Sequence, residues 1–280
     1  GVCSASAMRR ERRDTNRPGV ERPSAERPAF NPSRLLLLVV LVLAAFLRFH
    51  RLDAQSFWND EGNAARIAER PVALIIEGAA GDIHPPGYYL LLHVWRAAFG
   101  QSELALRSLS VVAGLALVAC TYLLGRLLFN EAVALIAAFL GAISPFGVYY
   151  SQEARMYALL GALSAWSALL VARILQSQWI QNRSQGIARS DPNKIGVTES
   201  DDSLHRHRLR GLVPFGVFAA VGAAGLYTHY AFAFVLVAHN VAFGIWWLVE
   251  RLRIRPRWRA LAAWAAAQMA ILLVYLPWLP

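Results

Sequence analysis

Hydrophobic residues occur along this chain in long blocks that contain no charged side chain. A helix needs about 20 mostly apolar residues to cross a bilayer. The longest block has 39 residues and a polar break at Thr228-His229, so it predicts two helices joined by a tight turn. The pattern therefore predicts an all-α fold, a polytopic transmembrane helix bundle of about seven spans. The six blocks are 35–47, 108–125, 132–152, 156–172, 211–249 and 260–280.

One further apolar segment, Pro85 to Phe99, is too short to be a span. Its 15 residues reach about 22 Å as a helix at ~1.5 Å per residue, whereas the hydrocarbon core is ~30 Å thick. Two prolines begin the segment, and Tyr88, Tyr89 and Trp95 suit the headgroup level. We expect an interfacial helix on the outer side of the membrane.

Composition and charge placement support this topology. The chain is 56% hydrophobic and 16% charged, which excludes an ordinary soluble domain. With the N-terminus on the cytoplasmic side, 21 of the 28 lysine and arginine residues fall on inner segments, as the positive-inside rule requires. The net charge of +10 is then explained by the membrane, and no nucleic-acid partner is expected. If Pro85 to Phe99 crossed the membrane, the arginines of 251–259 would lie on the outer side. This would violate the positive-inside rule, so the segment is not expected to be a span.

The chain divides into an arm and a membrane module. Residues 1–34 are rich in Arg and Pro and are expected to form a disordered, basic cytoplasmic arm. Residues 35–280 form the transmembrane module, with an outer loop at 51–107 and a cytoplasmic loop at 173–210. The run 35–47 also resembles a signal peptide, but no small-residue cleavage site follows it, which favours an uncleaved first span. The expected location is the cell membrane.

Unusual polar residues gather at four outer segments of this topology. Each has a structural explanation by itself: adjacent acids such as Asp60 and Glu61 favour a helix N-terminus, and Glu153 with Arg155 can form an ion pair. Their joint occurrence on one side of the membrane favours a functional site on the outer face. The segments contain Trp58-Asn59-Asp60-Glu61-Gly62, His84-Pro85-Pro86-Gly87-Tyr88-Tyr89, Ser151 to Tyr157, and Tyr227 to Tyr230.

In this order, the motifs WNDEG, HPPGYYLLLHVW, RSLSVVAGLALVACTYLLGRLLF and SQEARMYAL resemble those of GT-C-type integral membrane glycosyltransferases. This group includes the protein O-mannosyltransferases and the lipid A aminoarabinose transferase. The resemblance implies an enzyme that moves a sugar from a polyprenyl-phosphate donor to an acceptor on the outer side of the membrane. It also implies that Asp60 is in the catalytic acid-pair position with Glu61 beside it. Gly87 departs from the usual bulky residue, and the later spans and soluble domain of these enzymes are absent, so a C-terminally incomplete catalytic module is expected.

The residues also fit this chemistry without the resemblance. Transfer needs a base for the acceptor proton, assigned to Asp60, and positive charge for the departing phosphate, assigned to Arg155. Glu61 and Glu153 are expected to orient these groups or to help hold a divalent cation, Mg or Mn, although the sequence does not show that a metal is needed. The prenyl chain is expected to lie between the spans and the interfacial helix. The expected substrate-binding residues are His84, Glu153, Arg155, Tyr157, His229, Tyr230, Trp58 and Tyr88.

Two other classes of function compete with the transferase. A transporter or flippase of a lipid-linked or anionic substrate would place its charges near the middle of the membrane. In this sequence the charges fall at the outer ends of the spans, which favours the enzyme. A membrane scaffold would not require Asp60 or Arg155 at all.

Overall fold

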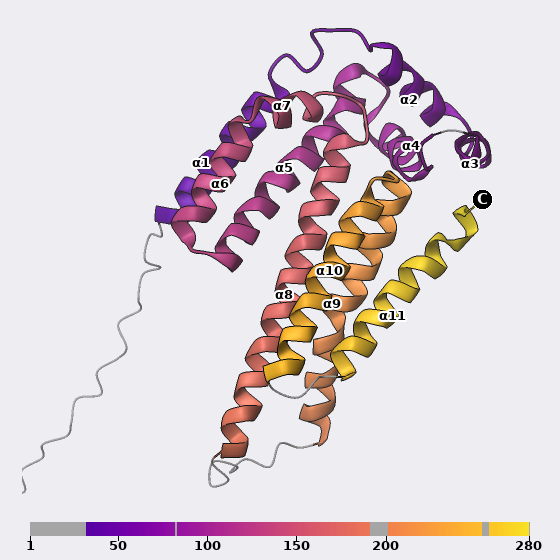
Figure 1. Cartoon of the computed structure of the whole chain (residues 1–280). Coiled ribbons are helices and arrows are strands. Elements are labelled where there is room, and N and C mark those ends of the chain that lie inside the picture. Colours follow the sequence, from indigo (N-terminus) through magenta and orange to yellow (C-terminus); the bar gives the residue numbers. More distant parts are fainter. Residues whose placement is uncertain (1–31, 82, 191–200, 254–257, 280) are drawn as a thin grey trace, which may run out of the picture. The chain divides into compact units, whose positions relative to one another are not determined.

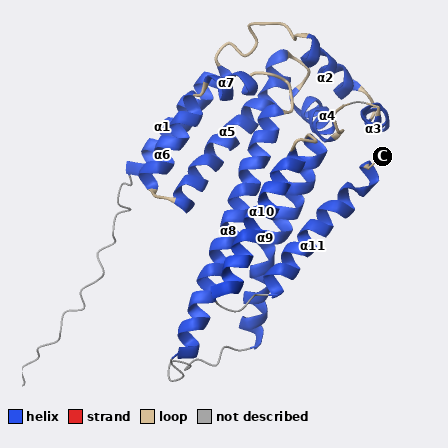
Figure 2. Cartoon of the chain, viewed as in Figure 1, coloured by secondary structure: helices blue, strands red, loops and turns tan. Residues whose placement is uncertain are grey.

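A computed structural model describes residues 32–81, 83–190, 201–253 and 258–279 of the 280-residue chain. Within these ranges the secondary structure is helical and contains no strand (Figure 2). The expected all-α bundle is confirmed. The expected arm falls almost wholly on residues 1–31, which lie outside the described ranges. The α-helices are α1 (Pro32–Phe49), α2 (Asn59–Glu69), α3 (Val72–Ala80), α4 (Gly87–Phe99), α5 (Glu103–Leu128), α6 (Glu131–Ile143), α7 (Pro145–Ser151), α8 (Tyr157–Ser190), α9 (Asp201–Thr228), α10 (Phe232–Arg253) and α11 (Trp258–Tyr275), and a 3-10 helix (Leu276–Trp278) follows α11.

Five described helices are long and apolar enough to cross a membrane: α1, α5, α8, α10 and α11. The bent pair α6 and α7 makes a sixth candidate. The seventh expected span corresponds to Leu212–Thr228 of α9, an apolar segment that is shorter than 18 residues. The polar break at Thr228-His229 does separate α9 from α10, as the sequence predicts. These helices indicate a multi-pass membrane protein.

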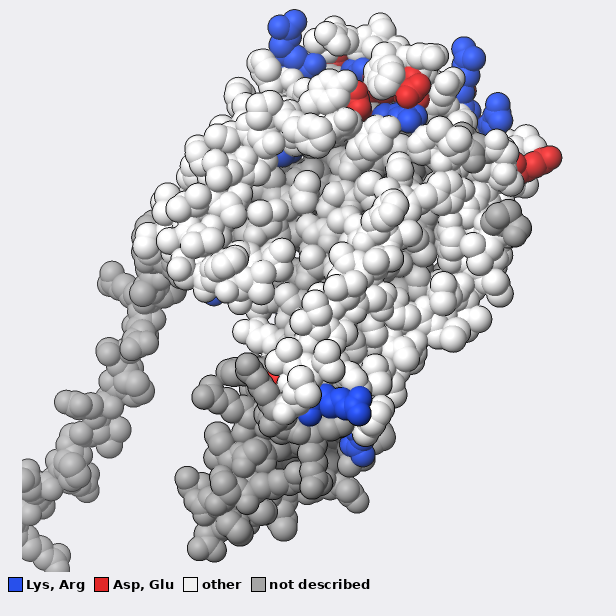
Figure 3. Space-filling model, viewed as in Figure 1, with Lys and Arg blue, Asp and Glu red and all other residues white. Residues whose placement is uncertain are grey.

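The surface has the charge distribution of such a protein. On the face shown in Figure 3, acidic and basic side chains gather at the two ends, and the broad band between them is almost free of charge. At one end the charged side chains lie over α2, α3 and α4, which are outside the set of candidate spans. The candidate site residues of the outer loop belong to this end.

The apolar block 132–152 is not one continuous helix. This corrects the expectation that it forms a single regular span. It bends by 58° between α6 and α7. Pro145 cannot donate a backbone hydrogen bond, and the Ser144 hydroxyl accepts one from Gly147 N, which begins a new helix. The carbonyl oxygens left at the end of α6 accept hydrogen bonds from Arg48, which is 1% exposed: Nη1 donates to Ala142 O at 3.0 Å and Nη2 to Gly141 O at 3.1 Å.

The expected cytoplasmic loop at 173–210 is also largely helical. The structure extends α8 to Ser190 and begins α9 at Asp201, so both helices are longer than their apolar parts. Gln, Arg and Ala are adequate helix formers, and a helix that leaves the bilayer has no need to remain apolar. Residues 191–200 lie outside the described ranges.

Gly87, the departure from the family pattern, begins α4 where this helix meets α9. A Cβ atom at position 87 would lie 2.5 Å from the carbonyl oxygen of Tyr227, so only glycine allows the two backbones to approach this closely. The opposite face of α4 packs Tyr88, Tyr89 and Leu92 into a core with α2 and the start of α5. The turn between α9 and α10 is thus held beside the outer loop.

Candidate active site

Two open cavities lie on either side of the chain segments around Asp60-Glu61 and Glu153-Ala154-Arg155. The first has a volume of about 630 Å³ and is lined by Asp60 and Arg155. The second, of about 670 Å³, is lined by Glu61 and Glu153. Successive residues of a helix point about 100° apart, so the adjacent acids at the start of α2 face different environments. The expected single site is therefore divided between two cavities.

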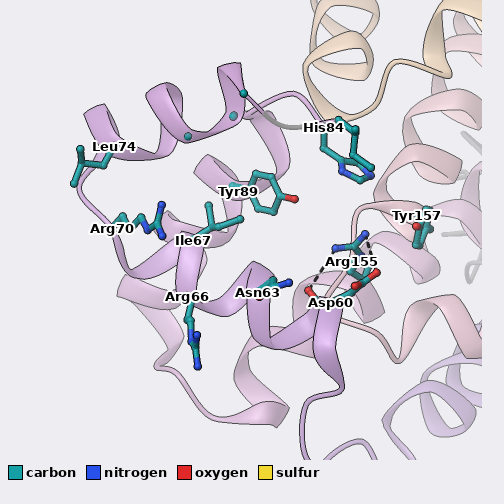
Figure 4. A pocket seen from close by; sticks show the side chains of 14 residues that line it. Asp60, Asn63, Arg66, Ile67, Arg70, Leu74, His84, Tyr89, Arg155 and Tyr157 are labelled. Atoms are coloured by element: carbon teal, nitrogen blue, oxygen red, sulfur yellow. Dashed lines mark hydrogen bonds and ion pairs between the residues drawn. The ribbon is translucent and has the colours of Figure 1, made fainter.

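Asp60 and Arg155 form an ion pair at the first cavity (Figure 4). The distance from Arg155 Nη2 to Asp60 Oδ2 is 3.4 Å, and the aspartate side chain is 41% exposed. Arg155 is 6% exposed, and its Nε has no hydrogen-bond partner among the described residues. A buried guanidinium with an unsatisfied N–H beside a cavity is suited to bind an anion that enters it.

Glu61 is held by a buried ion pair with Arg107, a residue of α5 that is not among the site residues expected from the sequence. Arg107 donates from Nε to Oε1 at 2.9 Å and from Nη2 to Oε2 at 2.7 Å. Oε1 also accepts a hydrogen bond from Ala154 N at 2.7 Å. With side chains 6% and 1% exposed, Arg107 and Glu61 are almost removed from water. This contact fixes the residues next to Asp60 and Arg155 relative to each other.

Two histidines and a tyrosine border the Asp60–Arg155 pair. His84 and Tyr157 line the first cavity, and the Arg155 guanidinium lies 5.7 Å from the centre of the Tyr157 ring. His229 packs edge-on against His84 with ring centres 5.5 Å apart, and its Nδ1 accepts a hydrogen bond from Ala231 N. Burial, and then the charge of Arg155, lower the pKa of His229. A lowered pKa favours the uncharged form of His229 near Arg155.

Glu153 and Trp58 line the second cavity and not the first. Glu153 is 7% exposed, and burial raises the pKa of its carboxyl group, although hydrogen bonding with Tyr149 opposes this change. Trp58 precedes α2 and is 47% exposed. These two expected substrate-binding residues therefore do not share a cavity with Asp60.

Tyr88 and Tyr230 are not brought to the first cavity either. Tyr88 is fully buried in the core between α2, α4 and α5, and this burial raises the pKa of its hydroxyl group. Its neighbour Tyr89 lines the cavity instead, because adjacent helical positions diverge. The Tyr230 hydroxyl accepts a hydrogen bond from Trp278 Nε1 at 3.1 Å.

Glu61 and Glu153, the residues expected to help hold a divalent cation, both line the second cavity. Both carboxylate oxygens of Glu61 are engaged by Arg107 and Ala154 N, and Glu153 and Asp60 face different cavities. In the ranges that the structure describes, no three His, Cys, Asp or Glu side chains form a group that could hold a metal ion.

The fold is that of the GT-C glycosyltransferases, as comparison with solved structures shows. The chain is similar to a Saccharomyces cerevisiae protein O-mannosyltransferase Pmt1-Pmt2 complex bound to the sugar donor, with a TM-score of 0.62 and 15% identity over 89% of this chain and 32% of that chain. It is also similar to the oligosaccharyltransferase AglB from Archaeoglobus fulgidus, in complex with an inhibitory peptide and a dolichol-phosphate, with a TM-score of 0.54 and 16% identity over 88% of this chain and 29% of that one. The chain spans about a third of the length of these proteins.

A family model agrees with the fold. Residues 83–183 match the family of dolichyl-phosphate-mannose-protein mannosyltransferases, and the match begins just before the HPP motif and covers SQEARMYAL. No curated protein matches the chain significantly. The resemblance to GT-C-type membrane glycosyltransferases that the sequence motifs indicate is confirmed.

Proposed function

We propose that this protein takes part in sugar transfer as a membrane glycosyltransferase, with a polyprenyl-phosphate sugar as donor and an acceptor on the outer side of the membrane. The observation that supports this most is Arg155, a buried arginine on the wall of an open cavity. Its Nη2 pairs with Asp60, and its Nε has no hydrogen-bond partner among the described residues. The fold and the family match agree with this proposal.

The roles follow from the charges. The acceptor oxygen forms a bond to the anomeric carbon of the sugar while the bond from this carbon to the phosphate oxygen breaks, and the electron pair of that bond leaves with the phosphate. Arg155 stabilises the negative charge on the phosphate, and Asp60 takes the proton of the acceptor. His84 and Tyr157 line the same cavity and are within the region where the donor head group would lie.

Charge placement favours an enzyme over a transporter. Asp60 lies in α2, which is not a candidate span, and Arg155 lies in the segment that joins α7 to α8. Transporters of lipid-linked substrates are expected to bind them at broken helices near the middle of the membrane. A transporter would also bind donor without releasing prenyl phosphate, which separates the two functions experimentally.

Donor binding tests the role of Arg155. Because lysine keeps the charge but lacks the planar fork, we expect Arg155→Lys to weaken binding of a prenyl-phosphate sugar about tenfold and Arg155→Ala more strongly. The measurement is the dissociation constant for the purified protein, with Arg259→Gln as a control because Arg259 is exposed and lies outside both cavities. Unchanged affinity in both Arg155 variants would remove this residue from the donor site.

The proposed orientation is tested by cysteine labelling. In a background without Cys3 and Cys120, a cysteine at the exposed position Ala80 should react with a membrane-impermeant maleimide in intact cells. A cysteine at Phe129, which is 70% exposed between α5 and α6, should react only after the membrane is opened. The reverse result would place the cavities on the cytoplasmic side and contradict the proposal.

A further inference from the structure

The first cavity extends well beyond the Asp60–Arg155 pair, along one face of α2. Asp60, Asn63, Arg66 and Arg70 all line it, at intervals of three or four residues. At ~1.5 Å per residue, Arg66 lies about 9 Å and Arg70 about 15 Å along the helix from Asp60. In Figure 4 the side chains of both arginines lie on the far side of the cavity from Arg155.

Among the residues that the structure describes, this far end has positive charge without a balancing acid. Arg66 and Arg70 are exposed, and neither forms an ion pair or hydrogen bond with another residue in the described part of the chain. Of the described residues that line the cavity, Asp60 alone is acidic, and Arg155 already engages it. The Arg70 guanidinium also lies against α3, since a Cβ atom at Gly78 would be 3.6 Å from Nη1. Two arginines in a concave surface, with no ion pair among the described residues, are suited to attract an anion.

We propose that Arg66 and Arg70 form a binding subsite for an anionic group of the acceptor, a phosphate or a carboxylate. This inference rests on the proposed function, because it takes the acceptor hydroxyl to lie beside Asp60. The phosphate of the donor is assigned to Arg155, and its prenyl chain requires an apolar membrane groove. The far end is bordered by α2 and α3, which are not candidate spans. The acceptor is the substrate left for this end of the cavity.

Arginine footprinting tests the subsite directly on the purified protein. Inorganic phosphate should slow the reaction of Arg66 and Arg70 with phenylglyoxal, measured at each residue by mass spectrometry. Arg259, which is exposed and has no ion pair among the described residues, is the matched control and should be unaffected. Equal reaction rates with and without phosphate at Arg66 and Arg70, or equal protection of Arg259, would overturn the proposal.

A second footprinting experiment uses prenyl phosphate as the probe and distinguishes a donor subsite from an acceptor subsite. If the subsite belongs to the acceptor, prenyl phosphate should leave Arg66 and Arg70 as reactive as before, and R66Q/R70Q should bind it with unchanged affinity. Protection of these arginines by prenyl phosphate, together with weaker binding in the double variant, would assign the far end to the donor and overturn the acceptor assignment.

Transfer kinetics give the functional test. Pairs of hydroxyl acceptors that differ only in a phosphate group should differ in kcat/KM, and the preference for the phosphorylated member should fall about tenfold in R66Q/R70Q while transfer to the neutral member stays the same. An unchanged preference would refute the subsite while leaving the transferase proposal intact. If no sugar is transferred to any acceptor, the proposed function fails, whereas the phosphate footprint still reports on the subsite.

Discussion

Asp60→Asn is expected to abolish most sugar transfer while donor binding survives. The substitution keeps the size of the side chain but removes the charge that receives the acceptor proton, and loss of a general base typically lowers kcat by about 10² to 10⁴. Asp60 also forms an ion pair with Arg155, with 3.4 Å between Asp60 Oδ2 and Arg155 Nη2. Because the asparagine variant lacks this charge, Arg155 is more available to the donor phosphate. The expected signature is low turnover with donor affinity at least as high as in the unmodified protein.

The measurement is kcat together with the donor dissociation constant for Asp60→Asn and for Asn63→Ala. Asn63 lines the same cavity one turn along α2, so it controls for a general disturbance of the cavity wall. Full turnover in Asp60→Asn would mean that another group accepts the proton. A parallel loss of donor binding would mean that Asp60 holds the donor and does not act as the base.

Breaking the Glu61–Arg107 pair is expected to have the largest effect on stability. Glu61→Gln leaves the buried Arg107 without its counter-charge, and removing one partner of a buried ion pair costs about 3–5 kcal/mol in the free energy of unfolding. The pair also fixes Ala154 N next to Arg155, so activity should fall with stability. Glu61 is therefore expected to act on the site through Arg107 and the backbone of Ala154, contacts that the sequence pattern does not reveal.

The check on this prediction is the apparent unfolding midpoint of Glu61→Gln in detergent. Arg126→Gln is the matched control, because it breaks an ion pair with Glu131 in which the side chains are 62% and 36% exposed. Exposed pairs contribute about 0–1 kcal/mol, so Arg126→Gln should unfold almost as the unmodified protein does. Equal midpoints for the two variants would show that the buried pair does not hold the outer loop in place.

The helical framework could be read from the sequence because it depends on local patterns. Apolar blocks locate the helices, and the polar break at Thr228-His229 locates the turn after α9. The bend between α6 and α7 was missed, although Pro145 was a signal for it. What fixes the bend is Arg48, whose hydrogen bonds reach residues about 90 to 100 positions away, and no pattern along the chain reveals such a contact.

The candidate site could be predicted only in part, because some of its contacts join residues far apart in the sequence. Asp60, His84, Arg155 and Tyr157, which the sequence motifs group together, do line one cavity. The motifs did not separate Asp60 from Glu61, although the helical period alone turns adjacent residues toward different surroundings. The role of Arg107 depends on a tertiary contact across 46 positions and could not be inferred from spacing.

The central claim is that the Asp60–Arg155 cavity transfers sugar from a polyprenyl-phosphate donor. The most direct test is to reconstitute the protein in liposomes with a small panel of radiolabelled prenyl-phosphate sugars and acceptors, and to measure both glycosylated product and released prenyl phosphate. The proposed function predicts equal amounts of the two products with at least one donor, and a loss of about 10² to 10⁴-fold in the rate of forming both with Asp60→Asn. Labelled donor that crosses the bilayer intact, with no prenyl phosphate released from any donor, would contradict it.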